Sequence, residues 1–313
     1  MSAPTNNMPA KKKIYPLFIM LSFLPLVIML CLNTAATMPA IFIGAYQMNK
    51  SGDGLDITNT AGLLAFPEAQ TALTVGFICY AVAAIIIFYI WYRKTFLKHQ
   101  IKIDNKTAFG VKSVVLSILL IIGTSSLISL GLYALDELAP SVMESYSETM
   151  SSAGLGSNFL ITLIYACILG PIAEELMFRA VTQGYLRRSG LNAVAVIFIQ
   201  AILFGIAHMN PVQSTYATVF GLSLGLLRHK YGNIRITCLA HIVFNVFGTF
   251  VQSAIASLDM PDAAYFAIYG TLAVIGIVAA VLIGKEPVKD IDLYKTAGVT
   301  PAPVATEPVQ ALT

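Results

Sequence analysis

Three short patterns place ionisable and amide side chains inside strongly apolar stretches of the chain. They are Glu174-Glu175-x-x-x-Arg179, Phe204-x-x-x-His208 and His241-x-x-x-Asn245. A charged side chain in the hydrocarbon core of a bilayer costs about 3 kcal/mol on insertion scales. Because several such groups occur in neighbouring apolar stretches, the patterns predict a buried polar site with a chemical role.

The residue types in these patterns suit the activation of a water molecule. A glutamate beside imidazoles in a dry cavity can act as a general base that later returns its proton. The side chains of His241 and Asn245 can donate hydrogen bonds to an oxyanion, a term worth about 3 kcal/mol per donor. Glu175 and Arg179 share a helix face and can pair, whereas Glu174 is rotated by about 100° toward another neighbour. The chemistry that fits the set is amide hydrolysis.

The spacing of the patterns from the turns of the chain predicts one common depth. The glutamate pair lies about 14 residues before the turn at 188–190 and His208 about 18 residues after it, so their heights differ by only about 5 Å. Counted from the next basic turn, His241 and Asn245 lie roughly 13 to 20 Å deep. Three helices can therefore bring their polar groups to one layer. Pro171, just before the pair, is expected to loosen the helix there.

The elements that must position these groups are membrane spans. The chain of 313 residues is 57% apolar and only 11% charged, whereas soluble domains are about a quarter charged. The expected fold is an all-α polytopic membrane protein with about eight transmembrane helices. The expected spans are Tyr15–Leu32, Thr71–Tyr92, Val111–Leu135, Asn158–Tyr185, Asn192–His208, Val212–Leu227, Ile236–Ser257 and Ala263–Gly284.

Basic residues predict the sidedness of these spans. They cluster before the first span, at 93–112, at 187–188, at 228–235 and after the last span, whereas the alternate loops carry Lys50 and most of the acidic residues. The positive-inside rule then puts both termini in the cytoplasm. In this reading Arg187 and Arg228 belong to the basic turns, and His99 and His229 lie in basic cytoplasmic loops where they are solvated. An alternative is that the first span is a signal peptide cleaved near Ala35-Ala36.

The organisation along the chain predicts a catalytic half and an accessory half. We expect a cytoplasmic N-terminal segment at 1–14, accessory helices and loops at 15–157, a catalytic transmembrane core at 158–284 and a disordered cytoplasmic tail at 285–313. Residues 33–70 are expected to form an outer loop, in which the apolar patch Met38–Tyr46 lies on the membrane surface.

The order EExxxR, FxxxH, HxxxN across consecutive late spans resembles the CPBP family of intramembrane proteases. This family includes the type II CAAX prenyl endopeptidases and bacterial bacteriocin-processing or immunity relatives. The resemblance covers Asn158 to about Phe250. It implies that Glu174 and His208 hold the attacking water, with Glu174 as the base.

The same resemblance implies roles for the other motif residues. His241 and Asn245 would stabilise the oxyanion, Glu175 and Arg179 would order the site, and Phe204 would pack beside the histidine helix. Ala180 stands where relatives often carry glycine, a departure that alters helix packing but removes no reactive group. The implied substrate is a membrane-associated peptide or protein, such as a prenylated C-terminus or a leader or signal peptide.

A zinc site is the alternative that these residue types leave open. If a metal is bound, its ligands would be Glu174, His208 and His241. The compact motif HExxH is missing, and Asn245 and Arg179 are poor ligands but good electrostatic groups. We therefore expect no obligatory cofactor.

Two further classes of function compete with an enzyme. A catalytically inactive peptide-binding or immunity scaffold of the same family could carry the same residues. An ion-coupled transporter would need polar groups along a path through both halves, yet the first three spans have no ionisable residue in their central portions. The expected partners are the substrate and the lipid bilayer, and nothing in the sequence suggests nucleic acid.

Overall fold

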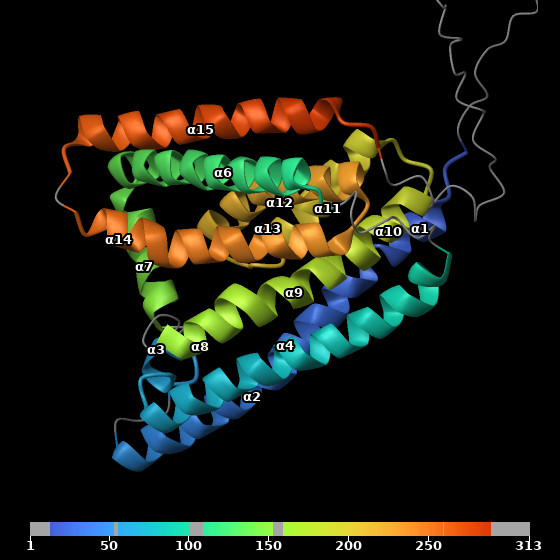
Figure 1. Ribbon diagram of the computed structural model, residues 1–313. Helices are drawn as coiled ribbons and strands as arrows, with labels where there is room; N and C mark the ends of the chain where they lie inside the picture. The colour runs from blue at the N-terminus through green and yellow to red at the C-terminus, as the bar shows by residue number, and fades with distance from the viewer. Residues whose placement is uncertain (1–12, 53–55, 100–108, 153–158, 259, 289–313) are drawn as a thin grey trace, which may run out of the picture.

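The computed structural model describes residues 13–52, 56–99, 109–152, 159–258 and 260–288, and all regular structure within these ranges is helical (Figure 1). The predicted tail at 285–313 and the N-terminal segment at 1–14 fall almost entirely outside the described residues. The helices of the first half are α1 (Pro16–Leu21), α2 (Leu24–Ser51), α3 (Thr60–Leu63), α4 (Pro67–Thr95), η1 (Leu97–His99), α6 (Val111–Leu138) and α7 (Pro140–Ser152).

The second half begins with one long rod of alternating α and π geometry. Its segments are α8 (Phe159–Ile161), η2 (Thr162–Leu169), α9 (Gly170–Glu175), η3 (Leu176–Thr182) and α10 (Gln183–Arg188). Then follow α11 (Ala193–Ile206), α12 (Pro211–Tyr231), α13 (Ile234–Val246), η4 (Phe247–Val251), α14 (Gln252–Ala256) and α15 (Asp262–Lys285). The π-helical turns η2 and η3 flank the glutamate pair, in the place where Pro171 was expected to loosen the helix.

Six helical stretches of the described chain are long and apolar enough to cross a membrane. They are Pro16–Ser51, Pro67–Thr95, Val111–Leu138, Phe159–Arg188, Ile234–Ile255 and Asp262–Lys285. Helix α11 is a shorter apolar helix, and α12 is not among the six. The prediction of an all-helical, multi-pass membrane protein is confirmed, whereas the count of eight spans stays a prediction.

The predicted outer loop is wrong between residues 33 and 51, because α2 continues as helix to Ser51. The apolar patch Met38–Tyr46 lies within this helix and not on a separate surface segment. Pro39 is accommodated inside α2, which ends at Gly52 in the left-handed conformation (φ 85°) that glycine adopts without strain. Ala40 and Gly44 of this stretch are buried, whereas the larger side chains of Met38, Phe42 and Tyr46 are exposed on the outside of the helix.

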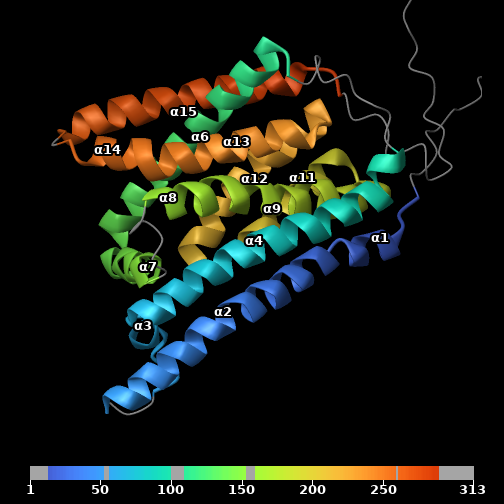
Figure 2. The same ribbon diagram turned by 60° about the horizontal axis from the view of Figure 1, so that its bottom comes forward.

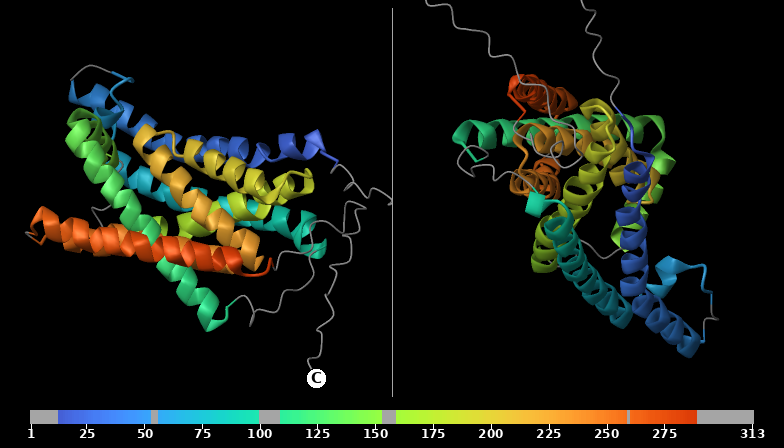
Figure 3. Two further views of the ribbon diagram at one scale, coloured as in Figure 1. Left: turned by 90° about the horizontal axis from the view of Figure 1, so that it is seen from above. Right: turned by 90° about the vertical axis from the view of Figure 1, so that its right-hand side faces the viewer.

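The helices form layers that leave the rod 159–188 in the middle. In Figures 1 and 2, α2 and α4 run side by side along one face, and α6 and α15 lie on the opposite side of the rod, with α11, α12 and α13 between. Figure 3 shows α6 crossing α15 at an angle. At this crossing Gly123 lies against the backbone of Gly276, where a Cβ atom on either residue would clash. Small residues thus allow close backbone contact between the two helices.

The helix ends that carry the basic loops gather at one end of the molecule. The Arg188 side chain donates to the Thr95 carbonyl at 2.7 Å, the Tyr15 amide to the Ser189 carbonyl at 2.8 Å, and the Lys230 ammonium to the Gly284 carbonyl at 2.6 Å. In Figure 1 this end holds α1 and α10, and the opposite end holds α3, α7 and α14. The arrangement agrees with the alternation of charged loops, and the assignment of the basic end to the cytoplasm stays a prediction.

Candidate active site

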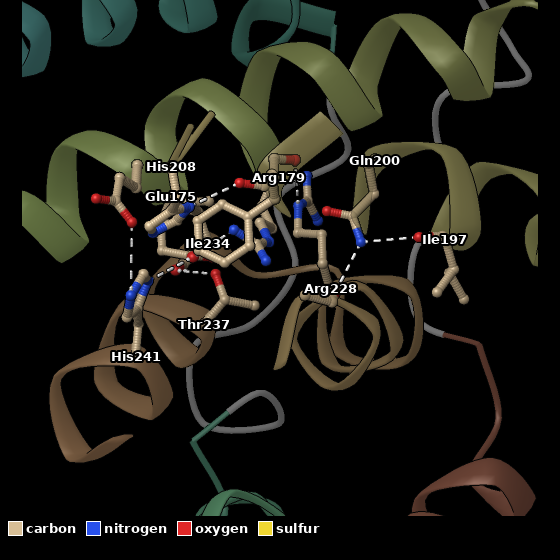
Figure 4. Close-up of polar contacts among 12 residues, drawn as sticks. Glu175, Arg179, Ile197, Gln200, His208, Arg228, Ile234, Thr237 and His241 are labelled. Carbon is tan, nitrogen blue, oxygen red and sulfur yellow. Dashed lines mark hydrogen bonds and ion pairs between the residues drawn. The ribbon is translucent and has the colours of Figure 1, made fainter. Parts of the chain in front are cut away.

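A chain of polar contacts connects the first and third patterns. The Glu175 carboxylate oxygen Oε1 lies 2.9 Å from Arg179 Nη1 and 2.9 Å from His241 Nδ1 (Figure 4). Since a carboxylate only accepts, His241 donates through Nδ1. Glu175 and Arg179 are fully buried and His241 is 3% exposed. The i, i+4 spacing of the first pattern therefore forms the ion pair predicted from it, and this pair also fixes the imidazole of His241.

Glu174 points away from this pair, as the one-residue offset predicts. Its Oε2 lies 3.6 Å from His241 Nε2, so the imidazole is placed between the two glutamates. The Glu174 side chain is 27% exposed, and it interacts electrostatically with the hydroxyls of Tyr80 and Tyr165. Of the two neighbouring carboxylates, one is thus sealed in the interior and the other is accessible.

The accessible glutamate lies on the wall of a cavity of about 590 Å³. The lining comes from α2, α4, α6, α7, the rod 159–188 and helices α11 to α14. The motif residues on this wall are Glu174, Phe204, His208, His241 and Asn245. The structure therefore brings the four predicted catalytic residues to one cavity, with Glu175 and Arg179 buried behind it. Their catalytic roles stay predictions.

His208 lies just past the end of α11. Its Nδ1 donates to the Phe204 carbonyl at 2.9 Å, which leaves Nε2 available to a partner in the cavity. Met209, the next residue, has φ 51° and is the only non-glycine residue of the described chain with positive φ. Asn210 then caps α12 by accepting from the Gln213 amide at 3.0 Å. The turn that follows His208 therefore contains a strained residue, Met209, and then the N-cap of α12.

Asn245 is held by the rod 159–188. Its Nδ2 donates to the Ala166 carbonyl at 2.6 Å. Ala166 lies in the π-helical turn η2, and such turns leave carbonyls available for side-chain donors. One N–H of the Asn245 amide is occupied in this way, so the second N–H and the carbonyl oxygen remain for the cavity.

Phe204 has a more central place than packing beside the histidine helix, the role implied by the resemblance. The Arg179 guanidinium lies over its ring, 4.2 Å from the centroid. The same ring meets the rings of His208 and His241 edge to face, with centroids 5.0 and 5.8 Å apart. Phe204 thus separates the buried ion pair from the cavity while contacting both, and a cation over an aromatic face is stabilising.

Several polar residues behind the cavity were assigned to other roles or missed by sequence reasoning. Arg228 is 2% and Arg187 6% exposed, so these two residues of the predicted basic turns are buried. The Arg228 Nε donates to the Arg179 carbonyl at 3.4 Å. His229 is half-buried and accepts from Arg187 Nη2 at 3.4 Å through its Nδ1. The α12 helix runs further than the apolar run predicted, to Tyr231, and carries Arg228 and His229 inward, whereas Arg187 lies on α10.

Two buried glutamines complete this region. Gln200 donates to the Gly221 and Ile197 carbonyls at 2.8 and 2.9 Å, and Gln183 donates to the Gly225 carbonyl at 3.3 Å. Neither belongs to a motif, and both join α12 to neighbouring helices. A glutamine within an apolar run was the one sequence signal that could have indicated them.

In the part of the chain that the structure describes, no group of three or more His, Cys, Asp or Glu side chains is arranged to hold a metal ion. The alternative zinc set of Glu174, His208 and His241 lines one cavity, but the His241 Nδ1 faces Glu175 and its Nε2 faces Glu174. The expectation of no obligatory cofactor stays a prediction.

Comparisons with known proteins match the segment that carries the motifs. Residues 156–247 fit the family model of the type II CAAX prenyl endopeptidases (Rce1-like). YdiL of Bacillus subtilis (strain 168), named as a membrane peptidase, is 28% identical over 92 residues, which is 29% of this chain and 37% of that protein. CAAX prenyl protease 2 of Arabidopsis thaliana is 25% identical over 126 residues, 34% of this chain and 40% of that protein.

The chain spans about two fifths of the length of these curated relatives. No solved structure matches the chain. The matched segment contains all seven motif residues, from Glu174 to Asn245. Residues 156–247 of the chain are therefore similar to the type II CAAX prenyl endopeptidases (Rce1-like) and to membrane peptidases, and the resemblance read from the motifs is confirmed for this segment.

Proposed function

We propose that the protein is an intramembrane endopeptidase that cleaves a membrane-associated peptide with a water molecule activated by Glu174. The observation that carries the proposal is the division between the glutamates. Glu174 is accessible in the cavity beside His208 and His241, whereas Glu175 is fully buried against Arg179. Only the first can reach a substrate.

In the proposed reaction Glu174 accepts a proton from water as the water oxygen bonds to the peptide carbonyl carbon. The free Nε2 of His208 helps to hold this water. Glu174 then passes the proton to the amide nitrogen as the carbon–nitrogen bond breaks, which gives a free amine and a carboxylic acid. A positioned acid–base group of this kind contributes about 10²- to 10⁴-fold to a rate.

The developing oxyanion needs hydrogen-bond donors in the cavity. Asn245 retains one amide N–H for this purpose. His241 already donates through Nδ1 to Glu175, so it can donate through Nε2 only as an imidazolium, and the buried carboxylate of Glu175 stabilises that cation. In this proposal Glu175 and Arg179 act through His241 and do not touch the substrate.

The surroundings of the cavity support an apolar substrate. A groove of about 460 Å³ between α6, α7 and α12 is lined almost entirely by apolar side chains. It shares the lining residues Ile128, Leu132 and Tyr216 with the cavity, so the two are adjacent. A lipid chain or an apolar peptide segment fits this groove. The Arabidopsis relative is named as a prenyl protease, which makes a prenylated peptide the first candidate and a leader or signal peptide the second.

The test is cleavage of quenched fluorescent peptides, with and without a prenyl chain, by the purified protein in detergent. Glu174→Gln is compared with Glu68→Gln, a matched change at an exposed glutamate at the start of α4. We expect Glu174→Gln to abolish cleavage and Glu68→Gln to leave it unchanged. Inactivity of the wild type on every peptide would favour the scaffold, and full activity of Glu174→Gln would refute the assigned base.

A chelator arm tests the proposed independence from metal. We expect cleavage to survive o-phenanthroline and EDTA. Loss of activity that added zinc restores would instead assign Glu174, His208 and His241 as ligands.

A further inference from the structure

A neutral polar cluster lies on the cavity wall away from the catalytic groups. Gln252 begins α14, directly after the π-helical turn η4. Its amide nitrogen Nε2 donates to Ser129 Oγ at 2.6 Å and to Ser125 Oγ at 3.3 Å, and both serines are on α6. All three residues line the cavity. An amide and two hydroxyls in the interior of a membrane protein are costly to bury, so their presence on this wall requires a reason.

The geometry leaves the acceptor of Gln252 for another molecule. Its Nε2 is occupied by the two serine hydroxyls, and the Ser129 hydroxyl donates in turn to the Ser125 carbonyl at 3.1 Å. Tyr265 on α15 donates to the Ser129 carbonyl at 3.3 Å and holds this part of α6 from behind. The amide is therefore fixed in orientation by its donor end, with its oxygen directed away from the serines. Such a fixed acceptor suits recognition of an N–H or O–H donor.

The cluster lies beside residues that line both the cavity and the apolar groove. Along α6, Ser125 and Ser129 alternate with Ile128 and Leu132, which line both the cavity and the groove. The π-helical turn before Gln252 shifts the register of the helix so that Gln252 reaches this stripe, and π turns of this kind recur at functional sites. A peptide whose apolar part occupies the groove would pass this cluster on its way to Glu174.

The cluster also lies outside the family segment. The match covers residues 156–247, which contain every motif residue, whereas Ser125, Ser129 and Gln252 lie before and after it. Catalytic groups shared by a family set the reaction, and contacts elsewhere in the cavity set the choice of substrate. The location is therefore that of a specificity determinant of this chain.

We propose that Gln252, oriented by Ser125 and Ser129, is a specificity-determining residue that selects peptides with a neutral hydrogen-bond donor beside the apolar segment. The inference rests on the proposed function and deepens it. The favoured substrate residues are Ser, Thr, Asn and Gln. A site built to bond such a group rejects an apolar analogue, because its own polar atoms are then left without a partner.

The experiment uses a matched peptide series in which each position between the cleaved bond and the apolar segment carries Gln, Leu, Asp or Lys. We expect the wild type to prefer Gln over Leu at one position by at least about tenfold in kcat/KM. Gln252→Leu should abolish or reverse this preference mainly through KM, with kcat on the Leu peptide kept. Gln252→Glu should create a preference for the Lys peptide, a gain that a merely structural role does not produce.

The control is Gln213→Leu, the same change at another cavity-lining glutamine on α12. It should leave the Gln-over-Leu preference intact. If Gln252→Leu and Gln252→Glu keep the wild-type ranking, or if Gln213→Leu alters it equally, the inference is overturned.

A binding assay separates this inference from the proposed function. The four peptides are titrated by fluorescence anisotropy into Glu174→Gln protein, with and without Gln252→Leu. The same ranking by dissociation constant would support the recognition role even if no peptide is cleaved. Equal binding of all four peptides to both proteins would refute it, whatever the outcome of the cleavage assay.

Discussion

Two layers of polar side chains lie next to each other in this molecule, and they differ in whether they are accessible from the cavity. The cavity layer comprises Glu174, His208 and Asn245, which line the cavity, and the buried layer comprises Glu175, Arg179, Gln183, Gln200 and Arg228, all at most 2% exposed. His241 contacts both layers. Adjacent glutamates in one motif thus have opposite surroundings, and this difference is the basis of the proposal that one layer transfers protons and the other compensates charge.

The largest expected effect comes from exchanging the two glutamates for glutamine separately. Glu174→Gln should lower kcat by about 10²- to 10⁴-fold while the protein stays folded. Glu175→Gln should instead destabilise the fold by about 3 to 5 kcal/mol, because the fully buried Arg179 loses its carboxylate. Peptide cleavage and thermal unfolding in detergent, measured on both variants, check the division.

A double variant sharpens this comparison. Replacing Glu175 by Gln and Arg179 by Met together removes both charges, so the double variant should be more stable than Glu175→Gln alone. Its catalytic rate should remain low, because His241 has then lost its charged acceptor. If the two single variants show the same pattern of activity and stability, the two layers do not divide the work as proposed.

The second effect concerns the donor in the cavity layer. Asn245→Ala removes the remaining amide N–H, so kcat should fall by about 10²-fold while KM changes little. Thr249→Val, one turn further on and also on the cavity wall, serves as the control and should keep most of the rate. A loss of stability in Asn245→Ala without a loss of kcat would show that its bond to Ala166 is its whole role.

The cavity layer was largely predictable from the sequence. Each of its members lies in a pattern whose spacing fixes a helix face, and counting residues from charged turns fixes a common depth. The ion pair of Glu175 and Arg179 followed from the i, i+4 rule in the same way. Local periodicity therefore carried most of the information about the site.

The buried layer was harder to predict because its members are defined by partners distant in sequence. Arg228 follows an apolar run and resembles a topogenic loop residue, and only the packing of α12 against the rod 159–188 brings it to the Arg179 carbonyl. The prediction of the first span ended with the apolar run at Leu32, yet α2 runs on to Ser51 and packs against α4. Tertiary contacts outweighed local composition in both cases.

A smaller effect is expected where the two layers meet, at the Phe204 ring over Arg179. Phe204→Leu keeps an apolar side chain but removes the cation–π contact, so stability should fall by about 1 to 2 kcal/mol more than in Phe244→Leu. Phe244 stacks on Phe220 with centroids 3.8 Å apart and is not over a guanidinium. Equal losses in thermal unfolding of the two variants would show that the contact contributes only packing.

The smallest expected effect is a gain in stability at the edge of the cavity layer. Met209 is 70% exposed and has φ 51°, a conformation that costs a non-glycine residue about 1 kcal/mol. Met209→Gly relieves this strain and should raise the midpoint of thermal unfolding by about 2 to 4 °C.

Met209→Ala is the matched control, because it removes the side chain but keeps the unfavourable φ, and it should not raise the midpoint. The strained turn also holds His208 in the cavity, so the glycine variant is expected to gain stability while losing part of its rate. Such a trade is typical of strain retained at functional sites. A glycine variant with the stability of the alanine variant would mean that the strain is relieved elsewhere, and one with higher stability and an unchanged rate would mean that the turn does not orient His208 for catalysis.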